Sequence, residues 1–400
     1  MSNLYFYLCS LITLLVTASF KFLLLGIETF QKEDDHIMAV ASGDFAYHNK
    51  LIDWVRSKGG YWNPKQELRS EDGLYGVFST QDINEGEILA SIPWSSVIEV
   101  PFRKDRFDNC DIVERLAKEM EKGDESNYSL YVQELVQTAK QHSKLLPSYW
   151  TAQGQELLLK IIGNGALPPL DPFLLKNKWK QSCEHISKEA TLLVLTHGES
   201  FGMVPITDKY NSRGGNYTGA FFSIEGQDEL ALEIRAYRNV KAGEQIFTDY
   251  RDYGKVGTAE LLRDYGFIEF YPQRWIFPDQ EIAFDIIRKK KMTVHWRRRV
   301  MQYTFKSPIR ENAQFQENTL QFLNGQLERL ETDIHPILMQ HLEARSLPEL
   351  ESEIIHKFYT DLTIALQLAI NDIKTKIVQK ESENSGEELA HALFNGADLS

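Results

Sequence analysis

The sequence has few cysteines and no motif that would bring them together. It contains three, Cys9, Cys110 and Cys183, and no Cys-x-x-Cys pair. Zinc ribbons, RING-like modules, iron–sulfur clusters and disulfide scaffolds are therefore excluded. The histidines also lack ligand spacing, so we predict no metal site. A metal-free enzyme, a binding module or a combination of both remains.

Positive charge is also scarce. The 400 residues include 44 Lys and Arg against 57 Asp and Glu, which gives a formal net charge of −13. An acidic chain repels phosphate backbones, so we predict no nucleic-acid partner. Two basic runs, 288–291 and 297–299, are the exception. Their spacing indicates a solvated face or a dock for an acidic substrate, and RNA binding there is the remaining alternative.

The first thirty residues are strongly apolar. The run 4–20 is almost wholly hydrophobic, and Lys21 separates it from a second apolar patch at 22–27. The first run is slightly shorter than the roughly 20 residues that span a bilayer. A signal peptide cleaved after Ala18 and an uncleaved membrane anchor both fit residues 1–30, and both predict the secretory pathway or a membrane. Otherwise the cytoplasm or an organelle remains.

Two Asn-x-Ser/Thr sequons, at Asn127 and Asn216, matter only in a secretory compartment, where an exposed sequon is glycosylated. Pairing of Cys110 with Cys183 likewise requires an oxidising compartment.

The hydrophobic pattern divides the remaining chain into segments. Residues 31–46 are polar and acidic, as in a linker. From 47 to 270, strand patterns flank a helical insert at about 105–200, and helical spacing then covers 280–382 before a polar tail at 383–400. We therefore predict an α+β fold, mainly β with a helical insert, followed by an all-α C-terminal domain.

Three weak motifs occur in a specific order. Residues 73–89 combine a glycine turn with Phe-x-Thr-x-Asp-Ile. Residues 203–212 begin with Met-Val-Pro and end in Asn-Ser, and residues 240–250 contain Gly-Glu-x-Ile and a tyrosine. Together they resemble SET-domain protein methyltransferases, and residues 259–267 are similar to the helix that follows in that family. The insert and the helical C-terminus resemble the non-histone branch related to the Rubisco large-subunit methyltransferase.

This resemblance implies a cofactor, a substrate and a set of site residues. The cofactor is S-adenosyl-L-methionine, and the acceptor is a lysine amine of a non-histone protein, which the C-terminal domain helps to recruit. We expect the enzyme to be a monomer. The implied catalytic tyrosine is Tyr250, with Tyr253 as the alternative because the motifs on either side favour different registers. The implied cofactor-binding residues are Leu74, Tyr75, Gly76, Asn211, Ser212 and Phe267.

The substrate amine must lose its proton before it can attack a methyl group. With an ordinary lysine pKa near 10.4, deprotonation at neutral pH costs roughly 4–5 kcal/mol. An apolar aromatic channel reduces this cost because it destabilises the ammonium form. Phe221, Phe222 and Phe267 are candidates for lining such a channel.

The sequence departs from the family pattern at three places, which leaves alternatives open. Leu74-Tyr75-Gly76 stands where a Gly-x-Gly turn is usual, Ser212 replaces a histidine, and an arginine upstream of the Val-Pro motif has no counterpart. A catalytically inactive SET-fold scaffold is therefore one alternative. A methyltransferase that acts on a histidine side chain is another.

Overall fold

The structure is a computed structural model. It describes residues 45–71, 74–99, 110–163, 186–199, 202–225, 231–250, 256–288, 290–300 and 303–395. The apolar segment 1–30 and Tyr253 lie outside these residues. The chain divides into two units, Met1–Ser42 with Ser70–Leu74, and Gly43–Arg69 with Tyr75–Ser400. The elements below belong to the second unit, apart from the adjoining ends of β2 and β3.

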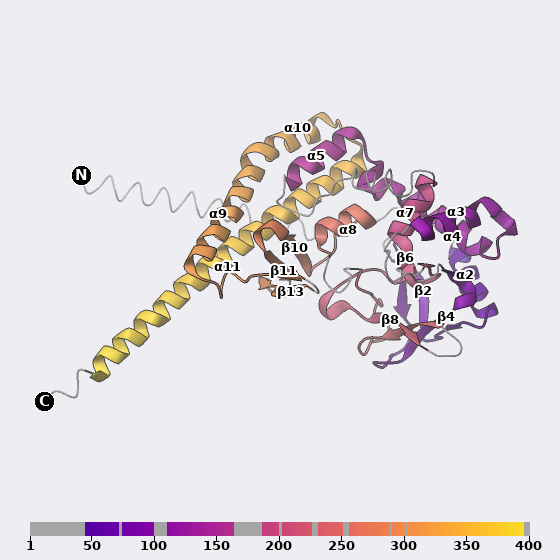
Figure 1. The fold of residues 1–400 in the computed structure, drawn as a ribbon, viewed down its shortest axis with the longest axis horizontal. Coiled ribbons are helices and arrows are strands. Elements are labelled where there is room, and N and C mark those ends of the chain that lie inside the picture. The colour runs from indigo at the N-terminus through magenta and orange to yellow at the C-terminus, as the bar shows by residue number, and fades with distance from the viewer. Residues whose placement is uncertain are drawn as a thin grey trace. The chain divides into compact units, whose positions relative to one another are not determined.

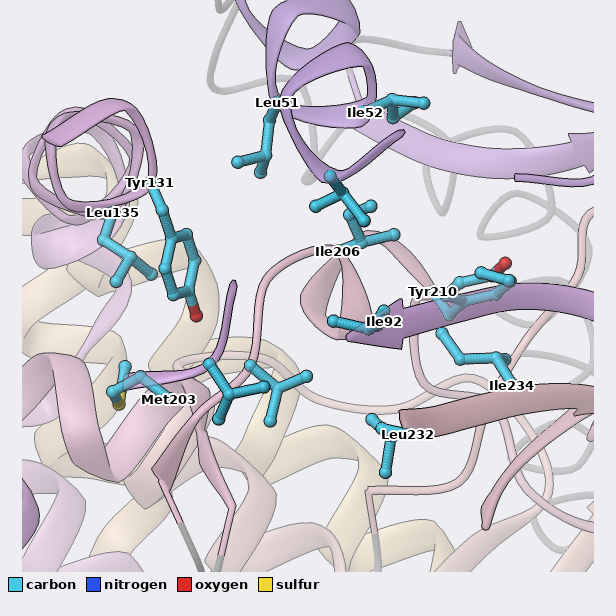
Figure 2. Close-up of a cluster of buried hydrophobic side chains, with 14 of the residues drawn as sticks. Leu51, Ile52, Ile92, Tyr131, Leu135, Met203, Ile206, Tyr210, Leu232 and Ile234 are labelled. Atoms are coloured by element: carbon cyan, nitrogen blue, oxygen red, sulfur yellow. The ribbon is translucent and has the colours of Figure 1, made fainter. Parts of the chain in front are cut away.

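A four-stranded antiparallel sheet forms the centre of the first half. Its strand order is β1 (Tyr61–Trp62), β4 (Ile88–Pro93), β9 (Ala231–Ala236) and β8 (Ala220–Glu225). Strands β2 (Gln66–Glu71) and β3 (Leu74–Ser79) pair separately, and β5 (Ile98–Glu99), β7 (Gly202–Met203) and β6 (Gly198–Glu199) form a third small sheet. The sheets and nearby helices enclose the first hydrophobic core, part of which is shown in Figure 2.

The described part of the predicted insert is largely helical. It contains α3 (Cys110–Lys122), α4 (Ser129–His142), α5 (Ala152–Ile162) and α7 (Lys188–His197). Buried apolar residues recur along one face of α3, which joins α4, α7 and α2 (Phe45–Ser57) on the first core. Helix α5 instead contributes Leu157, Leu158 and Ile161 to a second core. The insert therefore connects both halves of the molecule.

The second core is built on a strand layer and the C-terminal helices. Strands β10 (Gln273–Phe277), β11 (Ile282–Arg288) and β12 (Met292–Trp296) form an antiparallel sheet, and β13 (Arg299–Val300) pairs with β14 (Tyr303–Thr304). Strands β10 to β12 contribute to one core with α8 (Thr258–Tyr265), α9 (Ala313–Arg329) and α10 (His335–Ala344). Figure 1 shows the long α11 (Glu349–Asn395) beside α5 and α9. A π-helical turn, Leu330–Ile334, joins α9 to α10.

The fold class is confirmed, an α+β fold followed by a helical C-terminal region, but two predicted boundaries are wrong. Residues 282–304 contain strands, whereas we predicted helix from 280. Strand β11 is buried on both faces along most of its length, and periodicity cannot distinguish such an apolar run from a buried helix. The predicted polar tail from 383 is also wrong in part, since α11 continues to Asn395.

No helix in the described part of the chain is both long and apolar enough to cross a membrane. Since residues 1–44 are not described, the predicted signal peptide or anchor is untested.

Candidate active site

One segment, residues 243–248, is enclosed between two parts of the chain that are distant in sequence. On one side, the Ile246 amide donates to the Val77 carbonyl at 2.8 Å. On the other side, the Thr248 amide donates to the Asn211 carbonyl, and the Arg213 amide donates to the Thr248 carbonyl, both at 2.9 Å. We call residues 243–248 the threaded segment. It holds the first and second predicted motifs on either side of the third.

The Asn211 side chain lies against the first motif. Its Nδ2 donates to the Tyr75 carbonyl at 2.7 Å, next to Gly76. A Cβ at position 76 would lie 3.0 Å from Asn211 Nδ2 and 2.2 Å from Gln245 Nε2. Glycine is therefore required for this close approach of two amide side chains to the backbone of β3. We call Gly76 and the amide side chains of Asn211 and Gln245 the cradle.

Tyr250 lies two residues after the end of the threaded segment, beside the Asn211 motif. Its hydroxyl donates to the Tyr210 carbonyl at 3.0 Å, and its backbone amide donates to Ser212 Oγ at 3.1 Å. The Tyr250 phenol is thus hydrogen-bonded to the residue that directly precedes Asn211 in the chain. The structure brings Tyr250, Asn211, Ser212 and Gly76 together in one place.

An aromatic cluster surrounds the Tyr250 ring. Tyr265, at the end of α8, lies 4.9 Å from it between ring centroids, and Phe267 meets it edge-on at 6.3 Å. Gly266 separates these two residues and has a φ of +77°, so the chain leaves the helix in the left-handed conformation that favours glycine. The turn directs both rings toward Tyr250.

The environment of Tyr250 keeps its phenol protonated. Burial raises the pKa of Tyr250 far above its ordinary value, and the negative charge of Asp208 adds to this effect. The hydroxyl therefore serves as a hydrogen-bond donor and as a polar oxygen at neutral pH. It does not serve as a tyrosinate base.

Arg213 follows the Asn-Ser pair and lies among aromatic rings. Its guanidinium is 3.6 Å from the Tyr217 ring centroid and 5.8 Å from that of Phe270. Burial lowers the pKa of Arg213, but an arginine remains charged at neutral pH. The cation–π contacts hold the Arg213 side chain among these rings.

The remaining predicted site residues have more varied positions. Leu74 begins β3, and Tyr75 offers its carbonyl to Asn211. Phe221 is exposed and pairs edge-on with Tyr237, whereas Phe222 packs against the first core. Adjacent strand residues point to opposite faces, so these two phenylalanines do not line one channel. Of the three channel candidates, Phe267 has a described contact with Tyr250.

Sequence reasoning gave no role to Gln245, Tyr265 or the carbonyl of Tyr210. Tyr265 lies two positions before Phe267, at the end of a helix that is followed by glycine, and this pattern indicated that both rings could turn toward the same site. The Gln245 contact depends on pairing between distant segments, which no local pattern reports. Among the described residues, no cluster of His, Cys, Asp or Glu side chains could hold a metal ion.

Residues 74–251 match the family model described as the SET domain. This stretch contains the cradle at Gly76, the Asn211–Ser212 pair and Tyr250. The resemblance of the motifs to SET-domain proteins is therefore confirmed over residues 74–251.

Two curated relatives match part of the chain. An uncharacterised protein of Schizosaccharomyces pombe is 23% identical over 302 residues, which cover 65% of this chain and 63% of the relative. The N-lysine methyltransferase setd6 of Xenopus laevis is 23% identical over 279 residues, or 56% of this chain and 58% of the relative. The matched region thus spans less than two thirds of either relative.

Solved structures of a Rubisco large-subunit methyltransferase, named LSMT, are also similar. Its complex with sinefungin and monomethyllysine has a TM-score of 0.49 and 14% identity, and the match covers 83% of this chain and 92% of that one. Its SET domain bound to lysine and AdoHcy has a TM-score of 0.45 and 14% identity, with 84% and 92% covered.

Proposed function

We propose that this protein is an S-adenosyl-L-methionine-dependent methyltransferase that modifies a lysine side chain of a non-histone protein. The observation that carries the proposal is the meeting of the Gly76 backbone, the Asn211 amide and the Tyr250 phenol around the threaded segment. The SET-domain match and the similarity to a named N-lysine methyltransferase support it.

The residues present fit the cofactor. The absence of a Cβ at Gly76 lets the amide side chains of Asn211 and Gln245 approach the β3 backbone, and these amides with the adjacent backbone would hold the methionine end. Asn211 and Ser212 supply groups that both donate and accept hydrogen bonds, and Phe267 offers an aromatic face beside them. S-adenosyl-L-methionine supplies the methyl group on a sulfonium, which an amine attacks in line.

Catalysis by these residues consists of positioning and electrostatics. The protonated Tyr250 hydroxyl orients the incoming amine, and the neighbouring rings exclude water from its path. Tyr265 and Phe267 also favour the neutral amine, because an apolar surrounding destabilises the ammonium form.

Transfer of an isotopically labelled methyl group to proteins of a cell extract tests the proposal. We expect labelled protein with the wild type. With Tyr250→Phe we expect the label to fall about 100-fold or more, because the substrate amine is no longer oriented by the hydroxyl. Tyr253→Phe is the matched control and is expected to retain activity. No label with the wild type would contradict the proposal, and loss with Tyr253→Phe alone would move the catalytic role to that residue.

Calorimetry separates an enzyme from an inactive scaffold. Micromolar affinity for S-adenosyl-L-methionine supports the enzyme, since a scaffold has no need to retain the cofactor site. Identification of the labelled residue by mass spectrometry distinguishes lysine from histidine as the acceptor.

The compartment is a separate proposal that rests on the apolar segment 1–30. In support, the Asn127 and Asn216 side chains are exposed, and Cys110 is disulfide-bonded. We propose passage into the secretory pathway. N-terminal sequencing of the mature chain and a mass shift after glycosidase treatment test this, and an intact unglycosylated chain in the cytosol would contradict it.

A further inference from the structure

A group of buried charges lies immediately before the Asn211 motif. The Lys209 ammonium pairs with the Glu134 carboxylate of α4, and it lies 2.9 Å from Asp208 Oδ2. The three side chains are only 7%, 2% and 7% exposed for Lys209, Glu134 and Asp208. Buried charges persist in a protein only when they are paired. We call these three residues the acid–lysine cluster.

The backbone that leads into this cluster is strained. Ile206 is fully buried and has a φ of +77°, which a β-branched side chain rarely adopts. Such a conformation persists only where the surrounding structure enforces it. Figure 2 shows Ile206 and Tyr210 within the first core, with Tyr131 of α4. The Ile206 carbonyl also accepts the Lys209 amide at 2.9 Å, so the strained turn and the cluster form one unit.

Two groups of the candidate active site follow directly after Lys209. The Tyr210 carbonyl accepts the Tyr250 hydroxyl at 3.0 Å, and the Asn211 amide binds the Tyr75 carbonyl at 2.7 Å. A displacement of Lys209 therefore moves both the Tyr210 carbonyl, which accepts from the phenol, and the Asn211 side-chain amide.

We propose that Glu134 and Lys209 are positioning residues for the methyl-transfer site. Glu134 holds Lys209 from the helical insert, and the pair keeps the strained segment 206–211 in the geometry that places the Tyr210 carbonyl and the Asn211 amide. This role rests on the proposed function. It gives the insert an effect on catalysis even though α4 contributes no residue to the cradle.

A double substitution distinguishes positioning from mere stability. Buried ion pairs are often replaced by apolar side chains without loss of stability, whereas removal of one partner is destabilising. In Glu134→Leu with Lys209→Met, we expect a folded protein with a lowered melting temperature, because the buried Asp208 carboxylate keeps only His197, at 3.5 Å, as a described partner. We expect kcat to fall about tenfold or more, since small misplacements carry large costs, while KM for the protein substrate changes little. The dissociation constant for S-adenosyl-L-methionine should rise about fivefold, as for one weakened hydrogen bond.

Backbone exchange gives a readout that needs no activity. The Thr248 and Arg213 amides donate to backbone carbonyls of the threaded arrangement, and we expect both to exchange faster with deuterium in the double variant. Glu114→Leu with Lys118→Met, which removes an exposed pair on α3, is the matched control and should change neither exchange nor kinetics. If the apolar variant does not fold, Glu134→Gln with Lys209→Gln gives the same comparison with uncharged amides.

The outcomes separate the two proposals. Wild-type kcat, cofactor affinity and exchange in the folded double variant would overturn the positioning role. If the wild type neither binds the cofactor nor transfers a methyl group, the proposed function fails, and faster exchange confined to the double variant still supports positioning of this segment.

Discussion

Gly76 shows how a single position controls the cradle. The amides of Asn211 and Gln245 both approach the space where a side chain would be, and both end in atoms that can move. A larger residue is thus accommodated by displacement of these amides, without disruption of the sheet. Sequence alone indicated a close approach to the backbone here. It could not show that Asn211 and Gln245 are the neighbours, because that depends on how segments distant in the sequence pair in the fold.

Gly76→Ala should weaken binding of S-adenosyl-L-methionine about tenfold or more, because the added methyl group displaces the Asn211 amide from the Tyr75 carbonyl. Calorimetry measures this. Gly325→Ala is the control, since nothing lies within 4 Å of a Cβ there. Unchanged affinity in Gly76→Ala would show that the cofactor does not use this cradle.

His197 gives a stability prediction at the residue scale. Burial lowers the pKa of His197 below its ordinary 6.5, so below that pH the unfolded chain binds a proton that the native chain does not. Stability is therefore present above pH 6.5 and is lost as the pH falls, by at most about 1.4 kcal/mol per pH unit from this group. Urea unfolding of His197→Gln should show a shallower loss between pH 6.5 and 5. An identical slope in both proteins would contradict this.

At the scale of elements, the amphipathic helices and alternating strands were the predictable parts. The helical insert predicted at about 105–200 contains α3, α4, α5 and α7, and strands precede and follow it as predicted. The strands β10 to β12 were missed for two reasons. Most of the residues of β10 and β11 are buried on both faces, so they show no alternation. Some buried residues also form ion pairs with residues of other strands, and the spacing of charges along the sequence does not reveal such pairs. Asp285 is the clearest case. A carboxylate within an apolar run can be buried only because it pairs with Arg274 and Arg297.

The Asp285 carboxylate holds two arginines across this sheet. It binds Arg274 at 2.7 Å and also pairs with Arg297. Burial alone would raise the pKa of Asp285, but the hydrogen bonds and charges of Arg274 and Arg297 lower it below its ordinary value. Asp285→Asn should destabilise the protein by about 3–5 kcal/mol, because Arg274 is left as an unpaired buried charge.

Urea unfolding at pH 7 measures the effect of Asp285→Asn. The exposed Asp279 of the neighbouring turn provides the control, and Asp279→Asn should change stability by no more than about 0.5 kcal/mol. Equal stability of the two variants would mean that the buried pair contributes little.

At the scale of the molecule, the two hydrophobic cores are not built from two consecutive stretches of the sequence. Helix α5 belongs to the second core with α11, and the Thr151 hydroxyl binds Glu351 at 2.7 Å. Sequence patterns predicted a helical insert and a helical C-terminus, but they could not show that part of the insert packs with the C-terminal helices. That information lies in contacts between residues far apart in the sequence.

A chain truncated after residue 312 should therefore fail to form a stable SET domain. It retains every site residue but loses α9 to α11, which exposes apolar side chains of α5, α8 and β10. We expect low solubility and strong binding of a hydrophobic dye. A chain truncated after residue 395 keeps α11 and should behave like the full protein. A soluble, cofactor-binding product of the shorter chain would contradict the shared second core.

The threaded segment also constrains when during synthesis the site can exist. Its neighbours Val77 and Asn211 leave the ribosome first, yet their backbone carbonyls cannot acquire their amide donors, Ile246 and Thr248, until residues 243–248 have emerged. A nascent chain that ends before this point has no completed cradle, and so cannot capture a cofactor early to guide its own folding. Cofactor-assisted folding can therefore begin only after residues 243–248 have left the ribosome.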